Sequence, residues 1–598
     1  MFSRLGKILV SGPSNVAITN AAARIYDVSA TVARQYNKGR PSEEWACRRL
    51  VVRVYAHNIE EAAFMHLLEH PHDVENAGGR HSNFQLTYSR AYWLMVLFGA
   101  TDIGRLEDDD ARALHGMQQA MLSRPDLTPI FQRVSGQLSW EEYLAARTGG
   151  HEDQLSSLFD HVLDIADFVC PTPACSENNH NIRDWKKGKA RGVIIDEAAN
   201  MNRADLACVW GNCLLPCFLV GDPKQLPPTV MSARETDTEG FLVNRLTEDG
   251  RLSPLEMLQA SGIPVYRLHV QLRMPKALFD TVRREFYRDV PFTYAPWCDI
   301  TLPAFAPGRI LEEFAQARYP DLRPPPEGTF SPIFINCEGS RVFRNEMTLS
   351  KRCPGQVNVA LDFIADLVGA GVQPAKVTLL APYAANALHA EFRRREKYRK
   401  LLADMPPACT IDGYQGQEND IIVVVFGTNQ FHGVGFTAQA QRLNVLLTRA
   451  RCGLVLVGDL KAVEKKKGKG NKEGDKQIEL GPNGETVFMN VKSIRNIYRE
   501  LEEAGRVATV SAGAKAREGE ADEANPVEEG KKRKVDDADP FEEEKAAEAE
   551  PSTKKKKKKK NKKKKAEAKA ATKEEEEEEE KRDEGKEGVD AEMPETDK

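Results

Sequence analysis

Two adjacent acidic residues, Asp196 and Glu197, follow the apolar run Val193–Ile195. A short Val/Ile run bounded by polar residues is typical of a buried strand in a parallel sheet, and ligands collect beyond the carboxyl ends of such strands. There Asp196 could hold Mg²⁺, and Glu197 could orient and deprotonate a water for attack on a γ-phosphate. The same pair is also compatible with a solvated helix start, so its meaning depends on the surrounding sequence.

A turn-forming segment follows the next apolar run along the chain. The run Cys217–Val220 leads into Gly221–Pro228, where the glycine allows a tight turn and the prolines make the exit rigid. Gln225 is therefore held at a fixed place beside the strand edge, where a neutral amide could sense a phosphate oxygen or an attacking water. Taken alone, the segment is an ordinary turn.

Two later segments place arginines among apolar residues. Gln271–Pro275 contains Arg273, and Arg442–Arg451 contains three more arginines. A guanidinium matches phosphate geometry and can neutralise the charge that develops during phosphoryl transfer. A single arginine is more often part of a surface ion pair.

A glycine-containing segment, Thr410–Glu418, precedes the apolar run Ile421–Val425. Its glycines would let the backbone approach a ligand closely. By itself this segment is also compatible with a plain loop.

The elements that would position these residues form an α/β pattern. From Met1 to about Leu460, short Val/Ile/Leu runs alternate with longer amphipathic stretches, which is typical of parallel strands joined by crossover helices. The expected strands include Lys7–Val10, Gly192–Ile195, Cys217–Val220, Val377–Leu380, Ile421–Val425 and Leu454–Val457. We predict a first domain over residues 1–245, with a mostly helical insertion at about 24–157, and a second domain over 246–510.

The remaining residues, 511–598, have a different composition. Lys, Glu and Ala dominate and few aromatic or β-branched residues occur, so this tail cannot bury enough apolar surface to fold and is predicted to be disordered. Lys531–Val535 is a basic cluster of the kind that nuclear import receptors bind, although simple solvation is the alternative. Lys554–Lys565 adds a second basic block that would also bind RNA nonspecifically, and the acidic run Glu574–Glu580 could mask it.

Composition excludes several other classes. No apolar run of about 18 residues and no secretory signal occurs, so we expect a soluble intracellular protein. The 11 cysteines are scattered singly, so disulfides are not expected. Cys208, Cys213 and Cys217 lack the paired spacing of a zinc site, and we predict no structural metal.

Taken in order, the chemistry-bearing segments resemble the motifs of superfamily 1 helicases of the up-frameshift branch, the nonsense-mediated decay helicase-like family. The resemblance covers about residues 7–460, and six ordered motifs are far more specific than any one of them. The corresponding segments are Ile8–Ala17 for motif Ia, Asp196–Ala199 for II, Gly221–Pro228 for III, Gln271–Pro275 for IV, Thr410–Glu418 for V and Arg442–Arg451 for VI.

The resemblance implies two RecA-like P-loop NTPase domains, with ATP and Mg²⁺ in the cleft between them. Asp196 would carry the Mg²⁺ and Glu197 would be the catalytic base. The residues implied to read the γ-phosphate and to complete catalysis are Gln225, Arg273 and Arg449. The residues implied to bind ATP are Gln225, Arg273, Gly416, Glu418, Arg449 and Arg451. The residues implied to contact nucleic acid are Ser14, Asn15, Thr172, Pro382, Tyr383 and Gln415.

The sequence also departs from the family pattern. The tyrosine that usually follows the motif IV glutamine is Leu272, so base stacking at that point is not expected, and Asn386 replaces a common glutamine. More seriously, no Gly-Lys pair lies in the phosphate-binding pattern Gly-x-x-x-x-Gly-Lys-[Ser/Thr]. We expect a chain that starts downstream of this loop, or alternatively a remnant that binds without ATP turnover. We favour the first because the cleft residues all remain.

As printed, the chain is expected to be a poor ATPase whose first sheet lacks its central strand. The leading hypothesis is an ATP-driven translocase on single-stranded nucleic acid, with RNA favoured over DNA. The alternative is a catalytically silent nuclear RNA-binding or scaffold protein. The expected partners are single-stranded RNA or DNA and nuclear import receptors, with no membrane, and the expected location is the nucleus, with the cytoplasm as a second compartment.

Overall fold

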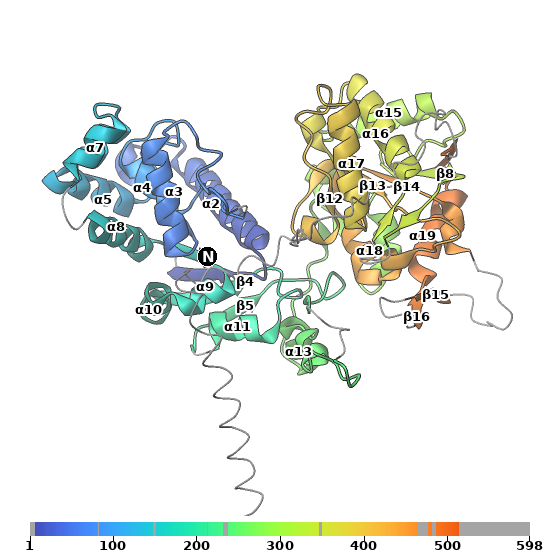
Figure 1. Cartoon of the computed structure of the whole chain (residues 1–598), viewed down its shortest axis with the longest axis horizontal. Helices are drawn as coiled ribbons and strands as arrows, with labels where there is room; N and C mark the ends of the chain where they lie inside the picture. The colour runs from blue at the N-terminus through green and yellow to red at the C-terminus, as the bar shows by residue number, and fades with distance from the viewer. Residues whose placement is uncertain are drawn as a thin grey trace, which may run out of the picture. The chain divides into compact units, whose positions relative to one another are not determined.

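The computed structural model describes residues 6–81, 83–147, 151–211, 213–230, 237–345, 350–464, 476–480 and 486–512. The predicted disordered tail, with its basic and acidic runs, lies outside the described residues from residue 513 onward. Within the described part, two parallel sheets carry the residues singled out above (Figure 1).

The first sheet has five described strands in the order β2-β3-β1-β4-β5. Their bounds are β1 (Lys7–Ser11), β2 (Val51–Val54), β3 (Phe168–Pro171), β4 (Ala190–Ile195) and β5 (Cys217–Leu219). The central strand is β1, in which Leu9 pairs with Val169 of β3 and Val193 of β4. Among the described strands β5 is an edge strand, and its Phe218 is 55% exposed. The expectation that this sheet lacks its central strand stays a prediction.

The stretch expected to be a helical insertion is mostly helical but also contains the edge strand β2. Its helices are α2 (Asn15–Asn37), α3 (His57–Glu69), α4 (Arg90–Leu97), α5 (Arg112–Leu122), α6 (Thr128–Val134), α7 (Trp140–Ala146) and α8 (His151–Ile165). Three further helices follow β3: α9 (Pro173–Asn178), α10 (His180–Gly188) and α11 (Arg203–Trp210). β2 is only four residues long and includes the charged residue Arg53, so it does not form a continuous apolar run in the sequence. The Arg53 side chain is nevertheless fully buried.

Successive residues of β1 point to opposite faces of the first sheet, and helices cover both faces at this strand. Ile8 and Val10 pack with Ile18 and Ala22 of α2. Leu9 joins the larger core formed with α3, α4, α5 and α8.

The second sheet has six described strands in the order β12-β11-β13-β14-β8-β17. Their bounds are β8 (Ile333–Glu338), β11 (Val377–Ala381), β12 (Cys409–Thr410), β13 (Asn419–Val425), β14 (Ala450–Gly458) and β17 (Val507–Ser511). The six expected strands of both sheets are confirmed to within a few residues. β8 and β17 were not among them.

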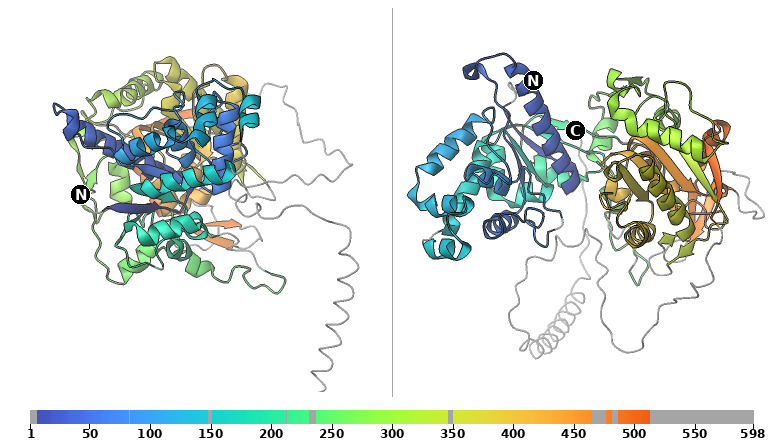
Figure 2. Two further views of the ribbon diagram at one scale, coloured as in Figure 1. Left: turned by 90° about the vertical axis from the view of Figure 1, so that its left-hand side faces the viewer. Right: turned by 90° about the horizontal axis from the view of Figure 1, so that it is seen from above.

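Helices cover both faces of the second sheet, as the views in Figure 2 show. One face carries α15 (Ala306–Arg318), α16 (Pro354–Gly369) and α17 (Ala384–Lys397). The other face carries α14 (Asp280–Phe286), α18 (Ala440–Leu447) and α19 (Lys492–Glu503). The chain thus leaves neighbouring strands toward different faces, which opens crevices at the strand ends.

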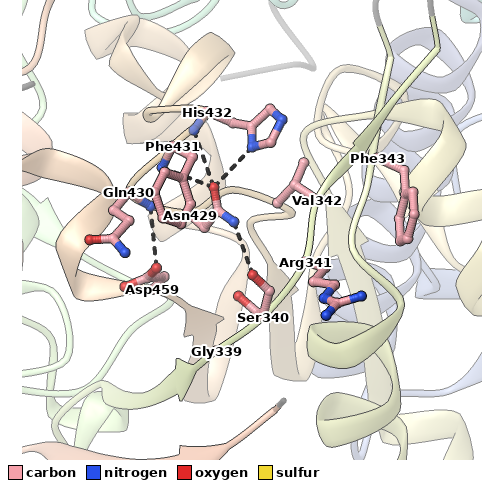
Figure 3. A pocket seen from close by; sticks show the side chains of 10 residues that line it. All are labelled: Gly339, Ser340, Arg341, Val342, Phe343, Asn429, Gln430, Phe431, His432 and Asp459. Carbon is pink, nitrogen blue, oxygen red and sulfur yellow. Dashed lines mark hydrogen bonds between the residues drawn. The ribbon is translucent and has the colours of Figure 1, made fainter. Parts of the chain in front are cut away.

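Short elements complete the described chain. They are α12 (Thr247–Gly250), α13 (Pro254–Ala260), β6 (Val270–Gln271), β7 (Thr293–Tyr294), β9 (Phe343–Arg344), β10 (Lys351–Arg352), β15 (Lys476–Leu480) and β16 (Thr486–Asn490). A pocket of about 430 Å³ lies beyond the carboxyl ends of β8, β13 and β14 (Figure 3).

Among the described residues, no helix is both long and apolar enough to cross a membrane. The same residues contain no group of three or more His, Cys, Asp or Glu side chains arranged to hold a metal ion. All 11 cysteines are free thiols.

Candidate active site

The paired carboxylates Asp196 and Glu197 lie where β4 ends between its neighbours β1 and β5. The Asp196 amide donates to the Ser11 carbonyl at 2.9 Å, and the Ala198 amide donates to the Val220 carbonyl at 2.8 Å. Glu197 has φ of +51°, a left-handed conformation that is uncommon for a non-glycine residue. Such strain costs on the order of 1–3 kcal/mol and clusters at functional sites.

Both carboxyl groups are held where ionisation is unfavourable. Burial raises the pKa of Asp196. Burial also raises the pKa of Glu197, and the negative charge of Asp196 raises it further, whereas Arg449, a hydrogen bond from Gln415 and Arg273 lower it. A cation bound beside this pair would stabilise the ionised carboxylates and so lower both pKa values.

The Gln225 amide is oriented by a set of hydrogen bonds. Its Nε2 donates to the Asp222 carboxylate at 3.2 Å, and the Tyr287 hydroxyl donates to that same carboxylate. The Asn444 amide in turn donates to the Tyr287 hydroxyl at 2.6 Å. With Nε2 occupied, Oε1 of Gln225 faces Arg449, whose Nη2 lies 3.5 Å away.

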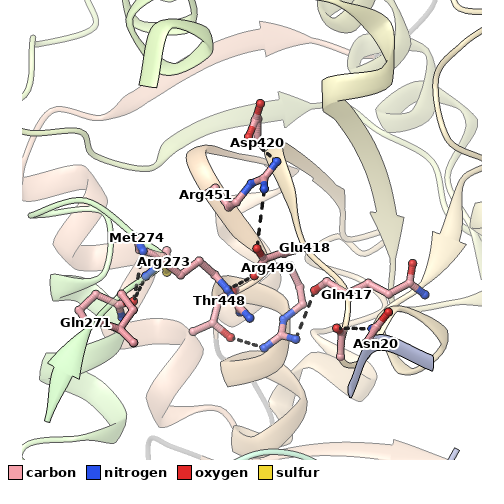
Figure 4. A network of polar contacts seen from close by, with 12 residues as sticks. Asn20, Gln271, Arg273, Met274, Gln417, Glu418, Asp420, Thr448, Arg449 and Arg451 are labelled. Carbon is pink, nitrogen blue, oxygen red and sulfur yellow. Dashed lines mark hydrogen bonds and ion pairs between the residues drawn. The ribbon is translucent and has the colours of Figure 1, made fainter. Parts of the chain in front are cut away.

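Arg449 is almost fully buried, with 3% of its surface exposed, at the end of α18 (Figure 4). Its guanidinium donates to the Val445 carbonyl at 3.0 Å and to the Thr448 hydroxyl at 3.0 Å. Burial, and then the nearby charge of Arg273, lower the pKa of Arg449 to about 10. Two neighbouring guanidinium groups therefore repel each other, and an anion between them would be favoured.

Arg273 and Glu418 form an ion pair, and Nη1 of Arg273 also donates to the Thr448 carbonyl at 2.9 Å. Arg451 contacts Glu418 more loosely at 3.8 Å and pairs with Asp420 at 2.7 Å. Two of the implied ATP-binding arginines, Arg273 and Arg451, are thus held by carboxylates at the start of β13.

Gly416 lies beside this group in a left-handed conformation, with φ of +77°. Its carbonyl accepts a hydrogen bond of 2.9 Å from the Asn20 amide of α2. This contact joins segments 396 residues apart in the chain.

The structure therefore brings together all five residues assigned to catalysis, together with Gln415, Gly416 and Glu418. Acidic groups face a place suited to a cation, and paired guanidinium groups face a place suited to an anion. That donor set fits a Mg²⁺-bound phosphate. Asp196 would hold the metal, while Arg273 and Arg449 would contact the phosphate.

Of the residues expected to contact nucleic acid, Gln415 lies in the candidate active site, where it hydrogen-bonds Glu197. The other five fall into two groups. Ser14 and Thr172 cap α2 and α9, and their hydroxyls accept from the amides of Ala17 and Cys175, each three residues further on. Asn15 lies beside Ser14, and its Oδ1 accepts a 2.6 Å bond from the buried Arg53. These three follow the neighbouring strands β1 and β3, so they share one edge of the first sheet.

Pro382 and Tyr383 follow β11 in the second sheet. Tyr383 is only 3% exposed and stacks on Phe436, with ring centroids 5.2 Å apart. The exposed aromatic side chain at this place is Phe436, which is 46% exposed. Direct base contact by Tyr383 is not supported by this packing, because Phe436 covers the ring.

Several residues that organise the site carried no usable signal in the sequence. Tyr287, Asp222, Asn20 and Arg53 are single polar residues whose partners lie far away in the chain. Asn386 is fully buried, and its Oδ1 accepts a hydrogen bond from the Cys353 amide, so its role here is structural. Leu272 is 57% exposed.

Comparison with known proteins gives the family. Two family models, both described as AAA domain, match residues 2–233 and 251–461. Helicase sen1 of Schizosaccharomyces pombe is 28% identical over 311 residues, which cover 51% of this chain and 16% of that protein. DNA-binding protein SMUBP-2 of Rattus norvegicus is 27% identical over 311 residues, covering 50% of this chain and 28% of that protein. Regulator of nonsense transcripts 1 of Caenorhabditis elegans is 26% identical over 328 residues, covering 52% of this chain and 26% of that protein.

Two RecA-like parallel sheets with arginines and carboxylates at their strand ends define the class, a two-sheet nucleoside-triphosphatase fold. The chain belongs to the up-frameshift-like family of superfamily 1 helicases. It spans less than a third of the length of each relative named above. A solved structure of the PRRSV helicase aligns with 54% of this chain and 47% of that chain, at 16% identity and a TM-score of 0.25.

Proposed function

We propose that this chain is the two-domain motor of an ATP-driven translocase on single-stranded nucleic acid, with RNA favoured over DNA. The observation that carries the proposal is the contact between Gln225, which follows β5 of the first sheet, and Arg449, which precedes β14 of the second. A γ-phosphate bound there would touch residues of both sheets, so hydrolysis would change the contacts that join them.

Each residue would have a separate task. Asp196 would hold Mg²⁺, which neutralises phosphate charge when bound with the nucleotide. Glu197, whose pKa is raised by burial, would accept a proton from the attacking water. Arg273 and Arg449 would stabilise negative charge that develops on the phosphate.

The domain limits of 1–245, 246–510 and 511–598 are part of this proposal, as is a nuclear location directed by Lys531–Val535. The relatives' names support nucleic-acid binding, since one is called a DNA-binding protein and one a regulator of nonsense transcripts. The second candidate is a catalytically silent RNA-binding scaffold.

The test is ATP hydrolysis, with and without single-stranded RNA, by the protein carrying its full natural N-terminus, because the printed chain has no Gly-x-x-x-x-Gly-Lys-[Ser/Thr] pattern and is expected to be a poor ATPase. We expect RNA-stimulated hydrolysis that Glu197→Gln lowers by about 10²–10⁴-fold. Glu239→Gln, at an exposed position, is the matched control and should leave the rate unchanged. Salt-dependent RNA binding with no hydrolysis would reject the motor and support the scaffold. Sequencing the 5′ end of the native transcript would show whether a phosphate-binding loop precedes Met1.

A further inference from the structure

The pocket of about 430 Å³ in the second sheet has no role in the site described above. It is lined by the loop 339–343 after β8, the loop 429–432 after β13, and Asp459 after β14. Arg449 and Glu418 precede β14 and β13, at the opposite ends of the same strands. The pocket and the candidate active site are therefore at different edges of the sheet.

The sheet topology opens a crevice at this pocket. β14 and β8 are parallel neighbours, but the next long helices after them pack on opposite faces of the sheet. The helix α16, after β8, belongs to the core with Ile333 and Ile335, whereas α19, after β14, belongs to the core with Phe334. Ligands of open α/β sheets bind outside the carboxyl ends of strands at such a switch point.

The two pocket loops are held together by Asn429, which is 4% exposed. Its Nδ2 donates to the Ser340 carbonyl at 2.9 Å, and its Oδ1 accepts the amides of Phe431 and His432 at 3.1 Å each. Asp459 accepts the Gln430 amide at 3.3 Å. The loop backbone is thus preformed, as Figure 3 shows with Phe431 and Phe343 on different sides of the pocket.

Exposed aromatic and basic side chains lie at the rim. Phe431 is 68% exposed and Phe343 is 52% exposed. The Arg352 guanidinium lies 5.6 Å from the Phe343 ring centroid, and Arg341 is an exposed lining residue. Exposed rings that hold bases by stacking, interleaved with cations that face the backbone, are the usual components of a single-strand binding surface.

The same surface continues toward β11. Lys351 donates to the His432 carbonyl at 3.2 Å and lies over the Tyr383 ring, which stacks on the exposed Phe436. The Arg442 guanidinium lies 5.2 Å from the Phe436 ring centroid. Exposed phenylalanines with arginine neighbours therefore lie near two strand-end crevices of one sheet.

We propose that the pocket formed by residues 339–343, 429–432 and Asp459 binds one base of a single-stranded nucleic acid, with Phe431 stacking on the base and Arg341 and Arg352 facing its phosphates. This inference rests on the proposed function and names a base-holding subsite for it. The buried carboxylate of Asp459 accepts hydrogen bonds from the backbone amides of Gln430 and Lys461. The exposed arginines at the rim are therefore the groups that would contact the phosphates.

The experiment measures binding of a fluorescent single-stranded oligonucleotide of about 12 nucleotides by the full chain. Phe431→Ala should raise Kd by about 5- to 100-fold, the effect of losing one stacked base. Phe431→Leu keeps the apolar bulk without a ring and should weaken binding similarly. Phe392→Ala is the matched control, because Phe392 is 63% exposed on α17 and does not line the pocket.

An abasic oligonucleotide separates stacking from charge attraction. The wild-type chain should bind it more weakly than the normal oligonucleotide, and Phe431→Leu should bind both alike. Equal Kd values for the wild type, Phe431→Leu and Phe392→Ala would overturn the base pocket while leaving the proposed function intact. Failure of the wild-type chain to bind any oligonucleotide at low salt would instead reject the proposed function, and the pocket with it.

Discussion

Glu197 combines a left-handed backbone conformation with a carboxyl group whose pKa is raised by burial and by its neighbour Asp196. Neither feature favours folding, and both lie at the residue that would act as the base. This is the pattern expected where function opposes stability at one position.

Glu197→Gln should therefore stabilise the protein near neutral pH by about 0.5–2 kcal/mol. The folded-state pKa of Glu197 lies above the unfolded one, so its contribution to stability is full below the unfolded pKa. It is lost as pH rises through the folded pKa. Thermal unfolding from acid to neutral pH should show the wild type losing stability relative to the variant. Parallel curves would contradict the expectation, and the exposed Glu239→Gln serves as the control.

Tyr287 connects the turn after β5 with α18, because its hydroxyl donates to Asp222 and accepts from Asn444. Tyr287→Phe leaves both partners without that hydroxyl and should cost about 1–3 kcal/mol of unfolding free energy. Because Asp222 also orients Gln225, we expect kcat to fall more than KM rises in an active form. Tyr266→Phe, at a side chain 86% exposed, should change neither unfolding nor kinetics. An unchanged kcat in Tyr287→Phe would limit Tyr287 to a structural role.

At the scale of elements, one buried ion pair joins the chain entering β17 to helix α15. Arg506 is 1% exposed and donates two bonds of 2.7 and 2.8 Å to the Glu312 carboxylate, and it also donates to the Arg323 carbonyl at 2.7 Å. Within the described sheet, the edge strand β17 pairs with β8 on one side only.

Arg506→Met should destabilise the protein by about 3–5 kcal/mol, because it leaves the Glu312 carboxylate buried without a partner. The double variant Arg506→Met with Glu312→Leu should recover much of that loss, since neither charge remains. Denaturant unfolding measures both. Arg499→Met removes a surface pair with Glu503 at 4.0 Å and should cost less than about 1 kcal/mol. A similar cost for Arg506→Met would show that the buried pair contributes little.

The expected strands also show what a local pattern can and cannot reveal. Val/Ile/Leu runs such as Ile421–Val425 are recognisable because both faces of a central parallel strand are buried. β2 was hidden by the charged residue Arg53, whose guanidinium donates to the side-chain oxygens of Asn15 and Thr19 and to the carbonyls of Val54 and Cys170. β17 was hidden because it is short and lies just before the charged tail.

At the scale of the whole molecule, the folded part and the charged tail differ in what they could contribute to nucleic-acid binding. The described elements end with β17 at Ser511. The lysine block Lys554–Lys565 lies beyond them and is interrupted only by Asn561.

A chain ending at Ala512 should therefore bind single-stranded RNA more weakly at low salt, with a shallower dependence of Kd on salt, because fewer phosphates are neutralised. A chain ending at Lys565 keeps the lysine block and lacks the acidic run, so it should bind at least as tightly as the full chain. Fluorescence titrations over a series of salt concentrations measure both effects. Identical salt slopes for all three chains would exclude a role for the lysine block.

The sequence by itself predicted the class of chemistry and identified the family. Phosphoryl transfer needs carboxylates, an amide and arginines in short local runs, and those runs keep their order along the chain. Local residues also set the strands that carry them, because burial on both faces demands continuous apolar runs.

Only the tertiary structure decided which of those residues meet and which side chains are exposed. The Gln225–Arg449 contact joins residues 224 apart, and the Tyr287–Asp222 bond joins residues 65 apart. No local pattern encodes such pairs, because they result from how two sheets and their helices pack. The same packing buried Tyr383 beneath Phe436 and left Phe431 exposed beside a pocket, although all three are aromatic residues near strand ends.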